Sequence, residues 1–228
     1  MNTLITGASR GIGLELCHQA LQSGHRVLAV ARKASHSEGL KKLHRDFPEL
    51  QIVDADLTQP KDLQRLLPQL KTWGSLDLLI NNAGILKGEG AGIQGVSPED
   101  LKECFEVNVV APIEMTKLCL PYLEKSKAPR VANLTSLMGS LSDNKSGGYY
   151  AYRISKSALN MFAKSFSVDH PKISCVVLHP GWVKTDMGGP QAPLSAEESG
   201  AGLWKFVQSM GTTHTGRFFD YRGRELPW

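Results

Sequence analysis

The chain has 228 residues and a formal net charge of +4, with a sequence pI of about 8.8. This length fits one α/β domain, and no charge block, low-complexity stretch or repeat divides it. No basic run is interleaved with aromatic residues, so we expect no nucleic-acid partner. No apolar run is long enough to cross a bilayer and no leader segment is recognisable, so we expect a cytoplasmic protein without membrane contact.

The residue types that usually bind metals are scattered along the chain. The seven histidines show no HExxH or similar ligand spacing, and no two cysteines form a CxxC pair. Each cysteine has apolar neighbours, which predicts buried thiols in a reducing compartment. The four are Cys17, Cys104, Cys119 and Cys175. We therefore expect neither a disulfide framework nor a metal cofactor.

Short apolar strands alternate with amphipathic helices along the chain. The strands are expected at 3–5, 26–31, 51–53, 76–80, 130–134 and 173–178. The helices are expected at 13–22, 38–45, 61–70, 98–120, 152–168 and 195–208. Brief strands rich in Val, Ile, Leu and Ala are typical of a parallel sheet that is covered on both faces.

This alternation predicts a doubly wound Rossmann fold, an α/β fold with a central parallel sheet, in a single domain over residues 1–228. We expect a cofactor half over about 1–110 and a catalytic and substrate half over about 111–228. In such a sheet, ligands bind outside the carboxyl ends of the strands. The segments that follow the expected strands are 6–13, 32, 54–58, 81–84, 135–136 and 179–187.

The first expected strand runs into the glycine-rich sequence TGASRGIG. Its glycines allow a tight turn and let the backbone approach a pyrophosphate, and the helix that follows offers free N–H groups to the phosphates. Glycine triplets alone are a weak signal, but this one follows a strand and opens a helix, which is the required context. The spacing is GxxxGxG, and the absence of GK[ST] argues against a P-loop.

Further motifs follow in a fixed order along the whole chain. They are Asp56-Leu57, Asn81-Asn82-Ala83-Gly84, Asn108, Ser136, Tyr152-x-x-x-Lys156 and Pro180-Gly181. Together with TGASRGIG, this ordered set resembles the short-chain dehydrogenase/reductase family. The segments GGYYAYRISKSALNM, HPGWVKTDMGG and ELPW are more similar still to its branch of C-factor and sniffer-like carbonyl reductases.

The resemblance implies a nicotinamide cofactor and names the residues that would hold it. Asp56 would bind the adenine amino group, although a turn or helix-capping role is the alternative. Asn81 would stabilise the central sheet. The expected cofactor-binding residues are Gly7, Ser9, Arg10, Gly11, Ile12, Gly13, Arg32, Asp56, Leu57, Asn82, Ala83, Gly84, Tyr152, Lys156, Pro180, Gly181, Val183 and Thr185.

Charge at the end of the second strand predicts the coenzyme. NAD needs an acid there for the ribose hydroxyls, whereas NADP needs a cation for its 2′-phosphate. The strand ends in Arg32 and Lys33, and Arg10 lies in the glycine turn. Arginines form charge-assisted bonds to phosphate, so we expect NADP(H). The alternative is that Arg32 and Lys33 are merely solvated.

The expected catalytic residues are Asn108, Ser136, Tyr152 and Lys156. Tyr152 and Lys156 are four apart and share one face of a helix, so the ammonium is expected to lower the tyrosine pKa from about 10. Ser136 would donate to a carbonyl oxygen while Tyr152 protonates it. By resemblance, Asn108 holds a water that links Lys156 to solvent. The predicted reaction is hydride transfer from NADPH to a carbonyl carbon, giving an alcohol.

Two segments depart from the family pattern. The turn-rich insertion 143–148 lengthens the segment before Tyr152, and we expect cofactor and substrate to order residues 141–149. The segment 188–194 is short, which suggests a reduced lid and an open pocket.

The alternatives to a carbonyl reductase are a nucleotide-binding signalling protein of C-factor type and a methyltransferase. By analogy, helices 98–120 and 152–168 pair in a homodimer or homotetramer.

Overall fold

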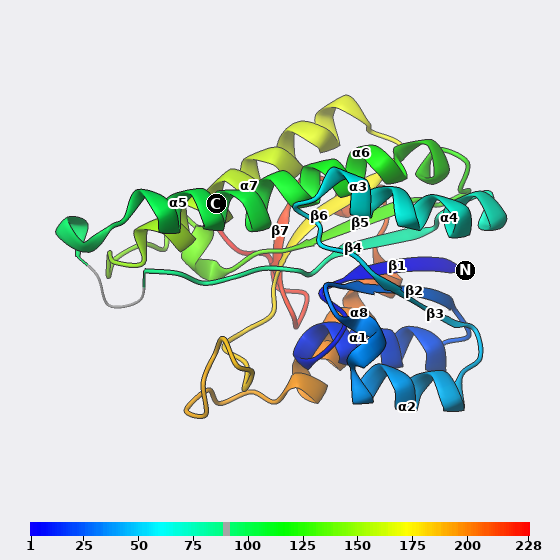
Figure 1. The fold of residues 1–228 in the computed structure, drawn as a ribbon. Coiled ribbons are helices and arrows are strands. Elements are labelled where there is room, and N and C mark those ends of the chain that lie inside the picture. The colour runs from blue at the N-terminus through cyan, green and yellow to red at the C-terminus, as the bar shows by residue number, and fades with distance from the viewer. Residues whose placement is uncertain (89–91) are drawn as a thin grey trace.

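The computed structural model describes residues 1–88 and 92–228. Its centre is a seven-stranded sheet in the order β3-β2-β1-β4-β5-β6-β7, with every neighbouring pair parallel (Figure 1). The strands are β1 (Asn2–Thr6), β2 (Arg26–Ala31), β3 (Leu50–Asp54), β4 (Leu78–Asn81), β5 (Arg130–Leu134), β6 (Ser174–His179) and β7 (Phe218–Asp220). The predicted doubly wound fold with a parallel central sheet is confirmed.

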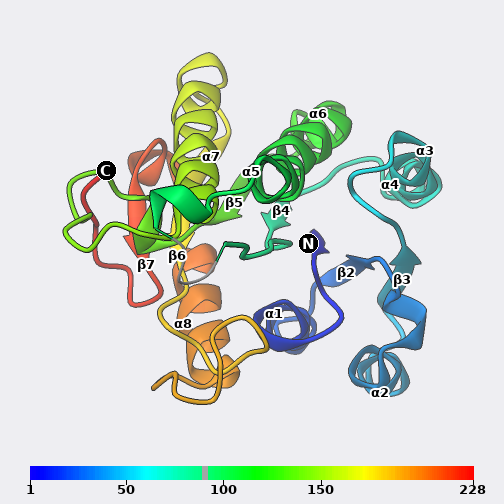
Figure 2. The same ribbon diagram turned by 60° about the vertical axis from the view of Figure 1, so that its left-hand side comes forward.

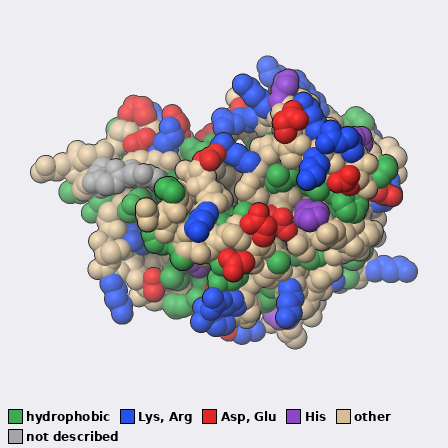
Figure 3. Space-filling view, turned by 90° about the horizontal axis from the view of Figure 1, so that it is seen from below, with side chains coloured by type: hydrophobic (Ala, Val, Ile, Leu, Met, Phe, Trp, Pro, Cys, Tyr) green, Lys and Arg blue, Asp and Glu red, His purple; other side chains and the backbone are tan. Residues whose placement is uncertain are grey.

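Helices cover both faces of this sheet. The helices α1, α2 and α8 lie on one face, and α3 to α7 lie on the other (Figures 1 and 2). Their bounds are α1 (Gly11–Gln22), α2 (Glu38–Asp46), α3 (Pro60–Leu63), α4 (Leu67–Trp73), α5 (Pro98–Phe105), α6 (Ala111–Leu123), α7 (Tyr150–Asp169) and α8 (Ala196–Ser209). On the face of α1, α2 and α8, basic and acidic side chains are interspersed (Figure 3).

Each face of the sheet has its own apolar core. Successive side chains of a strand point to opposite faces, so Ile5 packs in the core beneath α1 and α8, whereas Leu4 packs in the core beneath α6 and α7. In β6, Val176 and Val177 divide in the same way. Because both faces are buried, the strands read as continuous apolar runs, which is the pattern that identified them.

Three features of the fold differ from the sequence prediction. The strand β7 was not expected, because its three residues are too few to give a periodic signal. The expected helix 98–120 contains a π-helical turn, Glu106–Val110, between α5 and α6. The expected helix 61–70 is divided into α3, a 3₁₀ turn (Gln64–Leu66) and α4, because Pro68 lacks an N–H and suits the first turn of a new helix.

The parallel register brings the carboxyl ends of the strands to one edge. The residue pairs Asn81–Asn133 and Leu134–Leu178 are direct neighbours across β4, β5 and β6. The segments that follow these strands therefore meet, which positions the candidate site.

All four cysteines are buried free thiols, as predicted. In the part of the chain that the structure describes, no helix is both long enough and apolar enough to span a bilayer.

Candidate active site

The glycine-rich turn after β1 is shaped by glycines that no other residue could replace without strain. Gly7 and Gly11 have φ values of +64° and +55°, which L side chains rarely adopt. A Cβ on Gly7 would lie 2.8 Å from the Cα of Ala83, and a Cβ on Gly13 would overlap the carbonyl oxygen of Gly7. The turn thus leaves backbone exposed to a ligand and packs closely on the segment after β4.

The Asn82 side chain braces this turn. Its Nδ2 donates to the carbonyl oxygens of Thr6 at 2.9 Å and Gly7 at 3.1 Å. In return, the Thr6 hydroxyl oxygen accepts the backbone N–H groups of Asn82 at 3.0 Å and Ala83 at 3.1 Å. We had not expected this bracing role, because sequence shows no partner for the amide. The predicted contact of Asn82 with the cofactor stays a prediction.

The neighbouring Asn81 stabilises the central sheet, as the family resemblance implied. Its Nδ2 donates to the Oδ1 of Asn133 in β5 at 2.8 Å and to the Thr116 hydroxyl of α6 at 3.3 Å. All three side chains are buried. This network joins β4, β5 and α6 just below the point where the two strands deliver their loops to the site.

The predicted 2′-phosphate residues lie at the surface near the turn. Arg32 follows β2 and is exposed, while Arg10 forms an ion pair with Asp186 from the segment after β6. One acid does lie beside the end of β2, because Asp54 is paired with Ala31 across the sheet. Its carboxylate is occupied by Ser35, whose N–H donates at 2.8 Å and whose hydroxyl donates at 2.5 Å.

The Asp56 side chain closes a turn after β3. Its Oδ1 accepts the N–H of Thr58 at 3.0 Å and the Thr58 hydroxyl at 2.8 Å. The second role that the sequence allows for Asp56, a turn contact, is therefore present. Its predicted contact with adenine, and that of Leu57 beside it, stay predictions.

Ser136, Tyr152 and Lys156 come together where β5 ends against α7. Ser136 caps the 3₁₀ turn Leu137–Gly139, and its Oγ accepts the N–H of Met138 at 3.1 Å. Tyr152 and Lys156 lie one helical turn apart on the buried face of α7, and their exposed fractions are only 6% and 4%. The Lys156 Nζ donates to the carbonyl oxygen of Leu134 at 2.9 Å and lies 5.7 Å from the centre of the Tyr152 ring.

Burial controls the acidity of this pair. Removal from water raises the pKa of Tyr152 to about 12, although a side-chain hydrogen bond with Ser136 opposes the rise. Removal from water also lowers the pKa of Lys156 to about 8. The expected lowering of the tyrosine pKa by the ammonium is therefore not found: the pKa is raised, and desolvation of the phenolate is the largest cause.

Asn108 joins the segment after β4 to α7. It is fully buried in the π-helical turn between α5 and α6. Its Oδ1 accepts the N–H of Ile85 at 2.8 Å, and its Nδ2 donates to the carbonyl oxygen of Ile85 at 2.9 Å and to the Ser155 hydroxyl at 3.0 Å. Ser155 in turn donates to the carbonyl oxygen of Tyr152 at 2.8 Å. Sequence reasoning missed Ser155, which lies in α7 between the tyrosine and the lysine.

The segment after β6 leaves the sheet, and an isolated bridge pairs Val183 near its start with Leu194 near its end. Near its start, the carbonyl oxygen of Pro180 accepts the hydroxyl of Ser199 at 2.7 Å, which anchors the segment to α8. Beyond Val183, the Thr185 side chain approaches the glycine turn, since a Cβ on Gly11 would lie 3.1 Å from its Cγ2. Two segments that are both expected to bind the cofactor therefore adjoin.

Fold and site together define an α/β nucleotide-binding oxidoreductase. The model of the short chain dehydrogenase family matches residues 1–194, and the chain belongs to this short-chain dehydrogenase/reductase family.

Three known proteins illustrate the relationship. The C-signal protein of Myxococcus xanthus is 46% identical over 157 residues, which are 68% of this chain and 94% of that protein. The structure of carbonyl reductase Sniffer of D. melanogaster matches with a TM-score of 0.94 at 35% identity, covering 100% of this chain and 99% of that one. A carbonyl reductase from Pseudomonas aeruginosa PAO1 in complex with NADP matches with a TM-score of 0.89 at 39% identity and the same coverage.

Proposed function

We propose that this protein is an NADP(H)-dependent carbonyl reductase that converts an aldehyde, ketone or quinone to an alcohol. The observation that carries the proposal is the meeting of Ser136, Tyr152 and Lys156 beside a glycine turn at the carboxyl edge of the sheet. The similarity to two carbonyl reductases, Sniffer and the Pseudomonas aeruginosa protein in complex with NADP, supports the same assignment.

The residues around the turn fit a dinucleotide. The cradle of Gly7, Gly11 and Gly13 has no side chains to exclude a pyrophosphate, and α1 begins there with free N–H groups. Gly84 would let the cofactor lie close to the backbone beside Lys156, because a Cβ at Gly84 would lie 3.4 Å from the Lys156 Nζ. Arg10 and Arg32 would hold the 2′-phosphate. Further contacts would come from Ser9, Ile12, Asp56, Leu57, Asn82, Ala83, Pro180, Gly181, Val183 and Thr185.

The protein groups then divide the work of carbonyl reduction. The coenzyme supplies the hydride when bound. The hydroxyls of Ser136 and Tyr152 would donate to the carbonyl oxygen, where negative charge develops, and Tyr152 would give that oxygen its proton. A phenol with a pKa of about 12 stays protonated at neutral pH and so can serve as the donor. Asn108, through Ser155 and Ile85, would hold α7 in place against the segment after β4.

Lys156 has two proposed tasks. Its ammonium would hold the nicotinamide ribose hydroxyls, and it would favour the phenolate that remains after Tyr152 has released its proton. The pKa of about 8 means that Lys156 is mostly charged at neutral pH, so both tasks are available there. Resupply of the proton would pass through the water that the resemblance assigns to Asn108.

The cysteines bear on the cellular environment of the protein, and an exposed apolar stripe on α7 bears on its oligomeric state. Buried free thiols agree with a reducing, cytoplasmic environment. Ile154, Met161 and Val168 lie at seven-residue intervals on α7, and all three are exposed. A second copy of the chain would cover this stripe, so we propose a homodimer or a homotetramer.

Turnover tests this function directly. Purified protein is mixed with NADPH and benzaldehyde, acetophenone or menadione, and loss of reduced nicotinamide absorbance is followed against a protein-free blank. We expect turnover with at least one carbonyl class, and alcohol (or hydroquinone, where menadione is the substrate) formed in equal amount to the NADPH consumed. Tight NADPH binding without turnover of any carbonyl would instead support the second candidate, a nucleotide-binding signalling protein. The 46% identity with C-signal is the observation that favours this second candidate.

A further inference from the structure

The turn that carries Ser136 is seated directly on α7. The Ser157 hydroxyl and the Asn160 Nδ2 both donate to the carbonyl oxygen of Gly139, at 2.9 Å and 3.1 Å. Gly139 approaches α7 so closely that a Cβ on it would lie 2.9 Å from the Cβ of Lys156. The 3₁₀ turn after Ser136 therefore takes its position from side chains on the helix that carries the tyrosine and lysine.

Arg153, the residue after Tyr152, extends this contact to the rest of the connecting segment. Its Nη1 donates to the carbonyl oxygen of Met138 at 3.3 Å, in the turn that follows Ser136. Its Nε donates to the carbonyl oxygen of Gly147 at 3.2 Å, and its Nη2 donates to the Ser146 hydroxyl at 2.9 Å. One guanidinium thus joins the beginning of the segment between Ser136 and Tyr152 to its end.

The end of that segment has an uncommon backbone conformation. Gly147, Gly148 and Tyr149 all have left-handed backbone angles, with φ values of +64°, +65° and +50°. Tyr149 is the one non-glycine residue with positive φ in the described ranges 1–88 and 92–228. Such a conformation persists only where the surroundings determine it. The Arg153 side chain holds the near side of this turn through Ser146 and Gly147, and the far side is joined to α7 by the first helical bond, from the N–H of residue 153 to the carbonyl oxygen of Tyr149 at 2.9 Å.

We propose that Arg153 is a positioning residue whose guanidinium locks the turn after Ser136 and the left-handed turn before α7 onto the helix, and so sets the spacing of the Ser136 and Tyr152 hydroxyls. Only an arginine suits this task, because its planar fork directs several N–H groups outward at fixed angles. A lysine could reach one of the acceptors at a time. The kinetic part of this inference rests on the proposed carbonyl reduction, whereas its structural part does not.

The kinetic test compares Arg153→Ala and Arg153→Lys with the wild type. A misplacement of about 1 Å costs about a hundredfold in rate, so we expect kcat to fall between about tenfold and a hundredfold in Arg153→Ala. The NADPH dissociation constant should change less than about twofold, because Arg153 faces the segment 138–147 and not the glycine turn. Added millimolar guanidinium ion should restore part of kcat in Arg153→Ala. Arg153→Lys should stay impaired.

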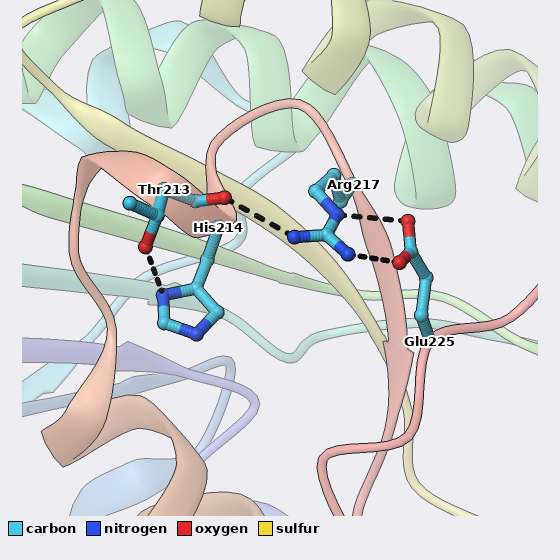
Figure 4. A network of polar contacts seen from close by, with 4 residues as sticks. All are labelled: Thr213, His214, Arg217 and Glu225. Atoms are coloured by element: carbon cyan, nitrogen blue, oxygen red, sulfur yellow. Dashed lines mark hydrogen bonds and ion pairs between the residues drawn. The ribbon is translucent and has the colours of Figure 1, made fainter.

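A matched control removes an arginine that makes a similar set of bonds elsewhere. Arg217 lies just before β7, pairs with the Glu225 carboxylate through two nitrogens and donates to the carbonyl oxygen of Thr213 at 3.3 Å (Figure 4). It stands at the amino end of the edge strand, opposite the site. Arg217→Ala should lower the melting temperature without changing kcat, and guanidinium should not alter its rate.

Hydrogen exchange tests the structural part without any turnover. Residues 141–149 should exchange at least about tenfold faster in Arg153→Ala than in the wild type, and Arg217→Ala should leave them unchanged. Unchanged exchange in Arg153→Ala would overturn the proposal whether or not a carbonyl substrate is found. An unchanged kcat in Arg153→Ala would overturn it equally. If the wild type reduces no carbonyl, yet residues 141–149 exchange faster in Arg153→Ala than in the wild type, the proposed function is removed and the locking role of Arg153 stands.

Discussion

The glycine turn after β1 and the segment between Ser136 and Tyr152 both form the candidate site, but different forces shape them. The turn is shaped by the absence of side chains, since backbone atoms of Gly7, Gly13 and Ala83 approach where a Cβ would collide. The other segment is shaped by side chains of α7, chiefly Arg153, that donate to its carbonyl oxygens. Steric exclusion allows almost no substitution, whereas a set of hydrogen bonds weakens in steps.

The largest effect on NADPH affinity should come from adding one methyl group to the turn. Gly13→Ala places a Cβ over the carbonyl oxygen of Gly7 and close to the Asn82 amide. The Gly7 carbonyl and the Asn82 amide must both shift, at a cost of about 1–3 kcal/mol. Because these groups shape the glycine turn that would hold the cofactor, the shift should weaken binding. We expect NADPH affinity to fall about a hundredfold in a fluorescence titration. Gly211→Ala is the control, because nothing lies within 4 Å of its Cβ position. Wild-type affinity in Gly13→Ala would refute the steric account.

Around Ser136 and α7, the loss of each side chain should change kcat and NADPH binding in a different way. Ser136→Ala removes one donor to the developing oxyanion, so kcat should fall about a hundredfold while the NADPH dissociation constant stays unchanged. Lys156→Ala should damage both quantities, because Lys156 is assigned to the ribose as well as to the tyrosine. Steady-state kinetics and a binding titration separate the two. The control is Ser165→Ala, an exposed serine of α7. Weaker NADPH binding in Ser136→Ala would contradict its assignment to the substrate oxygen.

A smaller effect should appear at the coenzyme's phosphate. The wild type should bind NADPH at least about tenfold more tightly than NADH, because one charge-assisted bond to the 2′-phosphate supplies about 1.4 kcal/mol. Arg32→Asp should shrink or reverse that preference. Arg45→Asp makes the same charge change at an exposed position of α2 and should leave the preference intact. Equal dissociation constants of the wild type for the two coenzymes would show that Arg32 is merely solvated.

The smallest effect should be a dependence of NADPH binding on pH. The pKa of Lys156 is lowered to about 8 by burial, so its ammonium is lost as pH rises through that value. Binding that requires the ammonium should therefore weaken above this pH and stay constant below it, with a loss of less than about tenfold per pH unit. The Lys156→Ala variant should lose the dependence. An identical pH profile in wild type and variant would assign the titration to another group.

Much of the fold and of the site could be predicted from residues that act locally. The glycines of the turn, Tyr152 and Lys156 at helical spacing, and apolar strands with both faces buried can each be recognised in a short stretch of sequence. The sheet network of Asn81 was expected through the family resemblance, and the bond to Asn133 confirms it. The segments that follow the strands also meet at the carboxyl edge as expected, because the parallel register brings those strand ends together.

What could not be predicted depends on contacts between distant segments. The bracing of Thr6 by Asn82, the link from Asn108 to Ser155 and the bonds of Arg153 depend on the path that each loop takes in space. The raised pKa of Tyr152 depends on how completely its phenol is withdrawn from water. The path of residues 141–149 likewise depends on a distant contact, the bond from Ser142 N–H to the Trp228 carbonyl oxygen at 2.9 Å. The expected ordering of these residues by ligands stays a prediction.

The central claim, that Tyr152 protonates a carbonyl oxygen during reduction, is tested most directly by Tyr152→Phe under single-turnover conditions. The substitution removes the hydroxyl and keeps the buried ring, so packing is preserved. With NADPH and an accepted carbonyl compound, we expect the rate of nicotinamide oxidation to fall at least about a hundredfold, because positioned acid catalysis is worth about 10²–10⁴ in rate. The NADPH dissociation constant should stay nearly unchanged. Oxidation of NADPH by Tyr152→Phe at the wild-type rate would contradict the account.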